Sequence, residues 1–248
     1  MKHLNELKAL LAVECNCSPD DFGRENNVIT LSAANEGRRI YQKEPFFFHM
    51  ATLGTNAVIT ADERLHPFLR EWAADTTGHW LFTQQSIPPL EKELAKNGYT
   101  IGCSHHLFLP QEDIRPQGDF PLKWFEGEEI HRFYGDKRFP NAICSEYIPH
   151  RPDTIVVCAM NNDEIMGMAG CSEDAKGWQQ IGIDVMPKYR SKGLGKCLVA
   201  TLKNEILRRG DIPFYGTSLS NLHSWNIAIG CGFRPAWTEI GCTKIERT

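Results

Sequence analysis

The sequence predicts an α/β protein whose C-terminal half is a mostly antiparallel sheet flanked by helices. Three neighbouring segments, Thr154–Met160, Glu164–Cys171 and Trp178–Met186, are rich in apolar residues and are separated by short turns, which predicts an antiparallel meander. The segment Leu194–Arg209 follows a helical period instead. Its apolar face consists of Leu194, Leu198, Leu202 and Ile206. Strands and helices that succeed one another in this way favour a mixed α/β domain.

Shorter elements complete the C-terminal half. Apolar periodicity and turn residues predict two more helices and two more strands. The helices are Glu126–Tyr134 and Leu222–Gly230, and the strands are Phe214–Thr217 and Trp237–Ile245.

The N-terminal half is an additional α/β lobe to which the sequence assigns no role. Leucines at helical spacing open it, and apolar segments with strand-like composition follow. The expected helices are residues 4–11, 62–72 and 90–97, and the expected strands are residues 46–53, 56–60 and 99–109. Prolines and glycines gather between Pro110 and Pro121, which is typical of a connection between domains. We therefore place the two domains at residues 1–115 and 116–248.

Composition excludes several classes of function. The chain of 248 residues has 42% hydrophobic and 23% charged residues, the balance of a globular protein. Its formal net charge of -4 provides no general attraction to nucleic acid or an anionic membrane. No apolar run has the length of a signal peptide or a membrane span, so we expect a cytoplasmic protein. Nine cysteines without recognisable metal-ligand spacing predict reduced thiols and no bound metal.

A short basic loop between the last strand of the meander and the long helix has the features of a phosphate-binding site. Gly193 and Gly195 allow a bulky group to approach the backbone, and the free N–H groups at a helix N-terminus favour an anion. Arg190, Lys192 and Lys196 add positive charge. The spacing fits neither GxGxxG nor GxxxxGK[ST], so those two nucleotide-binding motifs are not predicted.

Two segments together resemble the GNAT superfamily of N-acetyltransferases. Ile181–Gly195 contains the R-x-x-G-x-G pattern of that superfamily's acyl-CoA-binding motif. Asn221–Phe233 resembles the helix that follows in the family, which an Asn opens and a Gly-Phe pair closes. The two motifs stand in the expected order within the second half of the chain. The resemblance implies a sheet that splays at its centre and an enzyme that transfers an acetyl group from acetyl-CoA to a primary amine by direct attack in a ternary complex.

The resemblance also implies which residues hold acetyl-CoA. The backbone of Ile183 and Val185 is expected to hydrogen-bond the pantetheine arm, with Asn221 beside it. The loop that follows is expected to bind the pyrophosphate, and its residues are Arg190, Ser191, Lys192, Gly193, Leu194, Gly195 and Lys196. The backbone N–H of Val185 is expected to stabilise the oxyanion that develops on the thioester.

The sequence does not single out the groups that handle protons, because Ala228 stands where many family members carry a tyrosine as general acid. Ser224 and His223 are the nearby candidates for an acid. Asp184 is the first candidate for a base, and a hydrogen-bonded structural carboxylate is an equally good interpretation of it. Alternative carboxylates, for a base or for contact with a cationic substrate, are Glu146, Glu173 and Asp174.

Two functions other than catalysis stay open. The missing tyrosine is compatible with a non-catalytic acyl-CoA-binding sensor, and an interaction protein with a vestigial donor site is the second alternative. Glycines beside three basic residues argue against a vestigial site. The sequence leaves the acyl chain length and the acceptor undefined, although the acidic net charge favours a small-molecule amine over nucleic acid or a membrane as partner.

Overall fold

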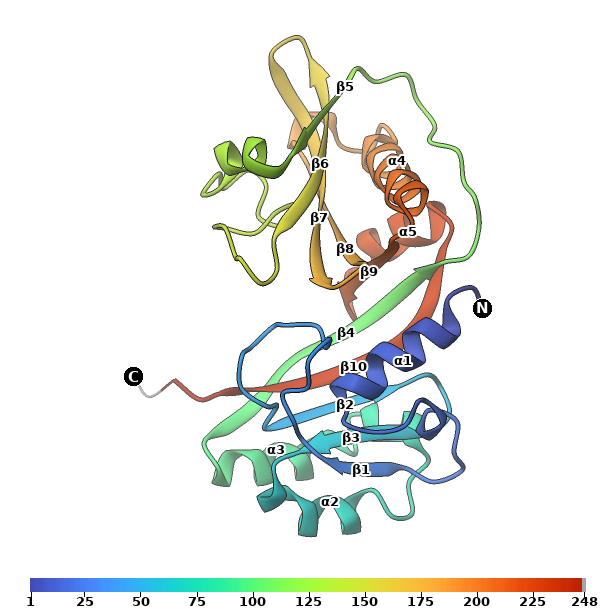
Figure 1. The fold of residues 1–248 in the computed structure, drawn as a ribbon, viewed down its shortest axis with the longest axis vertical. Helices are drawn as coiled ribbons and strands as arrows, with labels where there is room; N and C mark the ends of the chain where they lie inside the picture. Colours follow the sequence, from blue (N-terminus) through green and yellow to red (C-terminus); the bar gives the residue numbers. More distant parts are fainter. Residues whose placement is uncertain (247–248) are drawn as a thin grey trace. The chain divides into compact units, whose positions relative to one another are not determined.

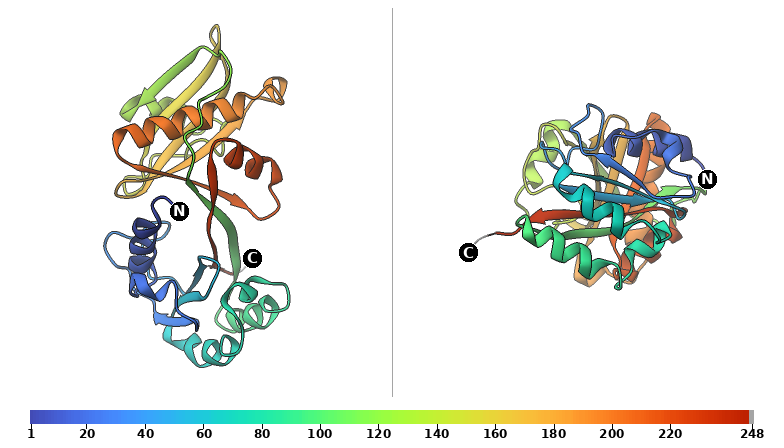
Figure 2. Two further views of the ribbon diagram at one scale, coloured as in Figure 1. Left: turned by 90° about the vertical axis from the view of Figure 1, so that its right-hand side faces the viewer. Right: turned by 90° about the horizontal axis from the view of Figure 1, so that it is seen from below.

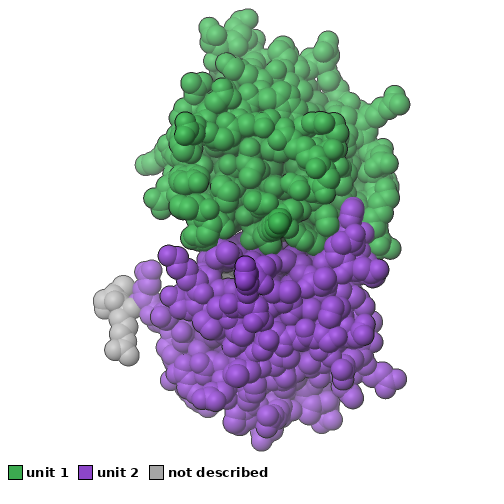
Figure 3. All heavy atoms as spheres, in the orientation of Figure 1, with its two compact units in different colours: residues 1–2, 108–235 green, residues 3–107, 236–248 purple. Residues whose placement is uncertain are grey.

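The computed structural model describes residues 1–246, which divide into two compact units (Figure 3). The C-terminal unit consists of Phe108–Pro235 with the first two residues of the chain. The N-terminal unit consists of His3–Leu107 and the chain from Ala236 onward. This division differs from the expected one at residues 115 and 116. The last strand follows the C-terminal unit in sequence, but it pairs with a strand of the N-terminal unit.

The C-terminal unit is built on five strands in the order β9-β8-β7-β6-β5 (Figure 1). Their bounds are β5 (Leu122–Glu126), β6 (Asp153–Asn161), β7 (Glu164–Ala175), β8 (Trp178–Val185) and β9 (Ile212–Ser218). The predicted meander is confirmed, because β6, β7 and β8 pair antiparallel. Strand β5 was not predicted, since four of its five residues are exposed and it lacks a clear apolar pattern. Strand β9 is parallel to β8, as a strand–helix–strand connection requires.

Two hydrophobic clusters lie on the two faces of this sheet. Helices α4 (Leu194–Arg209) and α5 (Leu222–Gly230) cover one face, and their bounds are those predicted from the sequence (Figures 1 and 2). The other face is covered by the short helix Gly127–Phe133 and by the segment after it. A helix was expected here at Glu126–Tyr134, and the structure has a 3-10 helix. The sheet therefore lies between the two helices and an irregular segment.

The N-terminal unit contains a second set of strands, in the order β1-β3-β2-β10-β4. Their bounds are β1 (Val28–Leu31), β2 (Phe48–Thr52), β3 (Ala57–Ala61), β4 (Tyr99–Pro110) and β10 (Phe233–Lys244), of which β4 and β10 extend into both units. The helices are α1 (Leu4–Glu14), α2 (His66–Trp72) and α3 (Ile87–Lys96). All expected elements of this half are present, and β1 is an additional strand that the sequence did not reveal.

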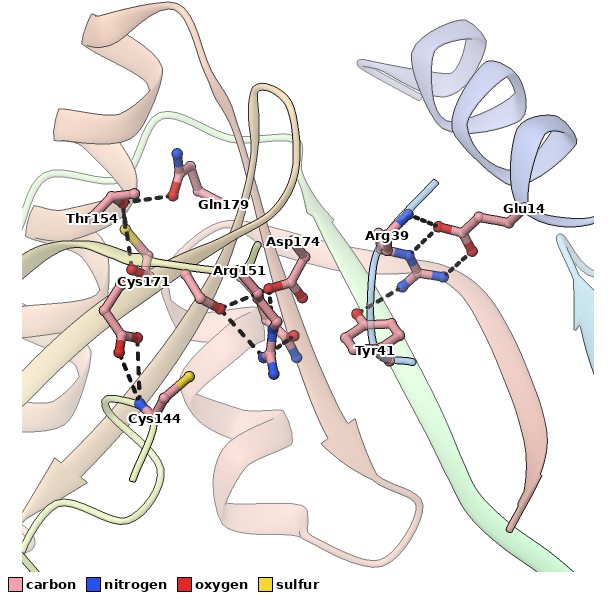
Figure 4. A network of polar contacts seen from close by, with 12 residues as sticks. Glu14, Arg39, Tyr41, Cys144, Arg151, Thr154, Cys171, Asp174 and Gln179 are labelled. Atoms are coloured by element: carbon pink, nitrogen blue, oxygen red, sulfur yellow. Dashed lines mark hydrogen bonds and ion pairs between the residues drawn. The ribbon is translucent and has the colours of Figure 1, made fainter. Parts of the chain in front are cut away.

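A buried ion cluster lies in the interior of the N-terminal unit. Arg39 forms a bidentate pair with Glu14, with nitrogen–oxygen distances of 2.6 and 2.7 Å (Figure 4). Its Nη2 also binds Glu239 at 2.8 Å. Although burial raises the pKa of Glu239, the Arg39 guanidinium outweighs it and lowers that pKa to about 2. Arg39 pairs with both carboxylates and Trp237 Nε1 donates to Glu239 Oε2 at 2.9 Å, so each buried charge has a hydrogen-bonded partner, which is the condition under which buried ions are tolerated.

Candidate functional site

The two parallel strands at the centre of the C-terminal unit pair along only part of their length. The register between β8 and β9 ends at Ile181 opposite Tyr215, although β8 continues to Val185 and β9 to Ser218. From Gly182 onward, β8 still pairs with β7 but no longer with β9. The sheet therefore opens between the last residues of β8 and those of β9, as the resemblance implied.

Backbone groups of β8 point into this opening. Met186 donates its N–H to the carbonyl of Met166 on β7 at 3.0 Å. Because backbone N–H and C=O groups alternate in direction along a strand, those of Val185 and Ile183 point away from β7, toward β9. These are the two residues whose backbone was predicted to bind a pantetheine arm.

A loop of exposed basic residues leads from β8 into α4. Arg190, Lys192 and Lys196 are exposed, and Gly193 precedes the helix in the left-handed region, with φ 77°. No side chain caps the N-terminus of α4, so its first N–H groups are available to an external anion. Ser191 also has a positive φ, 62°, which is uncommon for a residue other than glycine.

Gly195 allows α4 to lie close to β8 and α5. A Cβ atom at this position would stand 3.5 Å from Val185 Cγ2 and 3.4 Å from Ile227 Cδ1. The N-terminus of α4 is therefore next to the open edge of β8, and a single extended ligand can contact both.

The turn between β6 and β7 holds the basic loop in place. The Tyr189 hydroxyl donates to Glu164 Oε2 at 3.0 Å and accepts from Asn161 Nδ2 at the same distance. Lys188 Nζ donates to Glu164 at 2.7 Å. Arg190 donates its Nε–H to the carbonyl of Val185 at 3.0 Å. This hydrogen bond uses Nε, so the two terminal guanidinium nitrogens of Arg190 are available for a phosphate.

Asp184 binds a segment from the opposite face of the sheet. Its Oδ2 accepts the backbone N–H groups of Asn141 and Ala142 at 2.7 and 2.8 Å, and its Oδ1 accepts Asn141 Nδ2 at 2.7 Å. Both oxygens of this carboxylate are therefore engaged by donors from one neighbouring segment. These contacts favour the structural interpretation of Asp184 over the role of a base. Asn141 is 43 residues away in sequence, and no local pattern marked it.

Two hydroxyl groups meet at the start of α5. Asn221 Oδ1 accepts the backbone N–H of Ser224 at 3.1 Å and so caps the helix. Ser224 Oγ lies 3.0 Å from the hydroxyl of Tyr215, which is only 2% exposed. Burial raises the pKa of Tyr215 to about 12, so this phenol keeps its proton at neutral pH. The sequence indicated Ser224 but not its partner.

Two of the remaining candidates lie away from the opening. Glu173 and Asp174 lie toward the end of β7, which pairs with the beginning of β8. Asp174 is buried and accepts Arg151 Nε at 2.6 Å. His223 and Glu146 are exposed. The structure therefore gathers the basic loop, Ser224 and Asn221 around α4 and α5 and leaves two of the alternative carboxylates at the far end of β8.

Neither a metal centre nor a membrane span is found in the part of the chain that the structure describes. No group of three or more histidine, cysteine or carboxylate side chains there is placed to hold a metal ion. No helix within residues 1–246 combines the length and apolar character that crossing a bilayer requires.

One part of the chain matches the model of a known protein family. Residues 120–233 match the model of the acetyltransferase (GNAT) family. An acetyltransferase from the GNAT family of Colwellia psychrerythraea has 10% identity, with 81% of this chain and 82% of that chain covered and a TM-score of 0.45. An N-acetyltransferase from Kribbella flavida has 15% identity, with 66% of this chain and 66% of that chain covered and a TM-score of 0.47. The structure of a putative acetyltransferase from Salmonella typhimurium with its cofactor acetyl-CoA has 19% identity. The match covers 40% of this chain and 66% of that chain, with a TM-score of 0.31. No curated protein matches the chain.

The matched residues lie wholly within the C-terminal unit and include the opened strands, the basic loop, α4 and α5. They define an acyltransferase domain, and the protein is an acyltransferase. The family of this domain is the GNAT acetyltransferases.

Proposed function

We propose that this protein transfers an acetyl group from acetyl-CoA to a primary amine, by direct attack of the amine while both reactants are bound. The observation that carries the proposal is the position of the uncapped, basic N-terminus of α4 beside the open edge of β8. Coenzyme A joins a diphosphate to a pantetheine arm in one molecule. The N-terminus of α4 suits the diphosphate, and the open edge of β8 suits the pantetheine arm.

The donor would lie along the opening. The pyrophosphate would accept N–H groups from the start of α4, with Arg190, Lys192 and Lys196 around it. The amides of the pantetheine arm would then pair with the outward N–H and C=O of Ile183, in place of the missing β9 ladder, and the N–H of Val185 would face the thioester end of the arm. Asn221 would stand beside the arm, with its Oδ1 already committed to the helix cap.

The chemistry forms one C–N bond and breaks one C–S bond. The neutral amine attacks the thioester carbonyl, and the N–H of Val185 would donate to the oxygen on which negative charge develops. Holding two reactants together lowers the barrier by removing much of the entropic cost of their encounter. The departing thiolate takes one proton, and the amine loses one to solvent.

We assign the proton for the thiolate to the Ser224 hydroxyl, with Tyr215 behind it. The two oxygens are 3.0 Å apart, and the high pKa of the buried phenol keeps it a donor. This pair would supply the function of the tyrosine that the family often carries at the position of Ala228.

Calorimetric titration with acetyl-CoA tests the donor site. We expect binding by the parent and a loss of at least about 100-fold in affinity in Gly193→Glu, whose carboxylate would repel the pyrophosphate. Gly210→Glu is the matched control, because Gly210 has φ 90° at the other end of α4 and no atom within 4 Å of an added Cβ. Failure of the folded parent to bind acetyl-CoA would refute the proposal.

Turnover separates an enzyme from a sensor. Release of free CoA thiol would be followed with a polyamine, an aromatic amine, an amino-sugar antibiotic, an amino acid and a lysine-containing peptide as acceptors. Thiol release that depends on one of these amines supports the enzyme. Binding of acetyl-CoA without turnover on any acceptor would favour the sensor.

We infer that the acceptor is a small-molecule amine and that the protein works in the cytoplasm. The net charge of -4 supports a cationic small molecule over nucleic acid or an anionic membrane. Free thiols at all eight cysteines whose state the structure describes suit a reducing compartment.

A further inference from the structure

The sheet of the N-terminal unit has one apolar face and one polar face. On the apolar face, Ile59 and Ile240 belong to a hydrophobic cluster with residues of α2 and α3. On the opposite face, His49 and Thr60 are cross-strand partners on β2 and β3 and so lie side by side. Glu239 alternates with Ile240 along β10, so the buried ion cluster of this unit lies on the polar face as well.

Three side chains of this region have buried atoms without a hydrogen-bond partner among the residues that the structure describes. The atoms are His49 Nε2, Thr60 Oγ1 and Arg38 Nη1. The three residues are only 6%, 0% and 4% exposed. A buried polar atom costs free energy unless it is hydrogen-bonded, and most such atoms in proteins have partners. Three of them in one region therefore indicate that this region binds something polar.

The Phe46 ring joins Arg38 to the polar face. It stacks on the His49 imidazole with 4.8 Å between ring centroids, and the Arg38 guanidinium carbon lies 5.1 Å from the centroid of the same ring. Arg38 Nη2 donates to three backbone carbonyls, those of Gln42, Lys43 and Glu44. These acceptors carry no formal charge, so the guanidinium can still take an anion at Nη1.

Two glycines leave the sheet without side chains beside His49. Gly241 is the partner of His49 on β10, and among the described residues the one atom within 4 Å of an added Cβ is His49 Nδ1, at 3.9 Å. Gly102 on the adjacent strand β4 alternates with Ile101, which packs on the apolar face, so it belongs to the polar face. The three atoms nearest to an added Cβ on Gly102 are all backbone atoms, at 3.4 Å or more. Because Gly102 is exposed, a small molecule can reach this flat area from solvent.

We propose that the polar face of the N-terminal unit binds a small monocarboxylate, whose oxygens accept hydrogen bonds from Arg38 Nη1, Thr60 Oγ1 and His49 Nε2. A carboxylate has about four acceptor positions on its two oxygens, which is enough for three donors. Its single negative charge matches the Arg38 guanidinium, whose hydrogen bonds go to neutral carbonyls. A second negative charge, as in a phosphate dianion, would be repelled by Glu14 and Glu239. The site is separate from the proposed donor site and gives the N-terminal unit a binding role.

Protonation of His49 is coupled to this binding. The charged groups that face its ring are Glu14 from α1, Arg39 from the segment after β1, and Glu239 from β10. Burial is the largest influence and lowers the pKa of His49 below 6.5, so the imidazole is neutral at pH 7. A carboxylate at Nε2 favours the protonated imidazole and raises this pKa, so binding takes up a proton as the pH falls. We therefore expect about 3-fold tighter binding at pH 6 than at pH 8.

The experiment is calorimetric titration and thermal unfolding of the full chain with sodium acetate, propionate and benzoate. Sodium chloride at the same ionic strength and inorganic phosphate are the comparison probes. We expect saturable binding of at least one of the three carboxylates, with a rise in Tm that chloride does not reproduce. Gly193→Glu should bind that carboxylate as the parent does, since this substitution affects the proposed donor site alone.

Two variants test the residues of the site. Arg38→Met and Thr60→Val should each weaken carboxylate binding at least about 10-fold. Arg24→Met is the matched control and should leave the affinity unchanged, because Arg24 is an exposed arginine of the same unit that pairs with Asp21. Thr60→Val also replaces an unpartnered buried hydroxyl with a methyl group, so the Tm of the ligand-free protein should rise by about 2 °C or more.

Three results of the titrations would overturn the proposal. They are no binding of any of the three carboxylates by the folded parent, tighter binding of phosphate than of carboxylate, and equal binding by Thr60→Val and the parent. A lower Tm in ligand-free Thr60→Val would also contradict it, because the hydroxyl would then already have a partner such as a buried water molecule.

Discussion

The two faces of β8 are built by different means. On the α4 side, the site consists of backbone groups, two glycines and exposed cations that are contiguous in sequence from Ile183 to Lys196. On the other side, it consists of a carboxylate and glycines that hold a segment 43 residues earlier in the chain. A ligand of fixed chemical structure can be bound by a local motif. A face assembled from distant segments depends on tertiary packing instead, so a substitution there acts through the placement of segment 139–143.

The contrast between the two faces of β8 is tested most strongly by one glycine-to-alanine substitution on each face. Gly182→Ala places a Cβ 1.8 Å from the Asn141 carbonyl oxygen, so segment 139–143 must move. We expect a loss of stability of about 1–3 kcal/mol, as for overpacking elsewhere. We also expect kcat/KM for the amine to fall on the order of 100-fold, as for a misplacement of about 1 Å. Thermal unfolding and steady-state kinetics measure the two effects.

Gly195→Ala is the matched change on the other face. An added Cβ there meets only side-chain atoms, the nearest at 3.4 Å. Gly195 lies in the first turn of a helix, where alanine is favoured by up to about 1 kcal/mol. Packing and stability should therefore change little, whereas acetyl-CoA affinity should fall roughly 30-fold, because the added Cβ occupies space where the proposed site lets the pyrophosphate approach the backbone. A loss of stability equal to that of Gly182→Ala would remove the distinction between the faces.

Loss of cations should affect the donor side alone. Arg190→Gln combined with Lys192→Gln removes two exposed charges near the start of α4. At about 1 kcal/mol for each exposed charge, acetyl-CoA affinity should fall roughly 10- to 30-fold. The affinity of the parent should weaken with added salt more steeply than that of the variant. Titrations at two salt concentrations measure this, and an increase in KM for the amine alone would contradict the assignment.

The sequence predicted well those parts of the structure that depend on residues close to one another in the chain. The helical period of α4 and the strand pattern of β6 to β8 arise from residues close in sequence, so their bounds were predicted well. The exposed β5 and the short β1 have weak apolar patterns and were missed. The basic loop was found because its residues are adjacent.

The contacts of Asp184 and Ser224 could not be predicted in the same way. Asp184 reaches Asn141 across the sheet, and Ser224 reaches Tyr215 from another element. Which partner a polar side chain finds depends on tertiary packing that no local periodicity encodes. The return of β10 to the N-terminal unit is decided by pairing with β2, which also lies far away in sequence.

Tyr215→Phe tests the hydroxyl pair that Tyr215 and Ser224 form on the side of α4 and α5. The variant removes the partner of Ser224 without changing the packing of the ring, and we expect kcat to fall about 10-fold with KM for the amine unchanged. Burial raises the pKa of Tyr215 from 10.0 to about 12, so the folded protein keeps this proton where an unfolded chain loses it. The corresponding stability is fully present below pH 10 and is lost as the pH rises through 12.

The pH profile therefore supplies the control for this variant. Between about pH 7 and 9 the parent and Tyr215→Phe should have rate profiles of the same shape, because Tyr215 does not titrate there. Above pH 10, chemical denaturation should show a smaller alkaline loss of stability in the variant than in the parent. If the rate profile of the parent has a basic limb at about pH 8 or 9 and Tyr215→Phe lacks that limb, the pKa of Tyr215 is not raised.

The smallest effect is expected at Ser191, a residue of the basic loop that has a positive φ although it is not a glycine. Its φ of 62° lies in the left-handed region, which is unfavourable for a residue with a Cβ by roughly 1 kcal/mol. Ser191→Gly relieves this strain but increases the freedom of the unfolded chain, so a net gain of about 0.5 kcal/mol in unfolding free energy is expected. Since the loop is held by Tyr189 and Arg190, acetyl-CoA affinity should change less than about 2-fold. A larger loss of affinity would show that the Ser191 hydroxyl itself contacts the donor, and the α4 side of β8 would then depend on a polar side chain as the other side does.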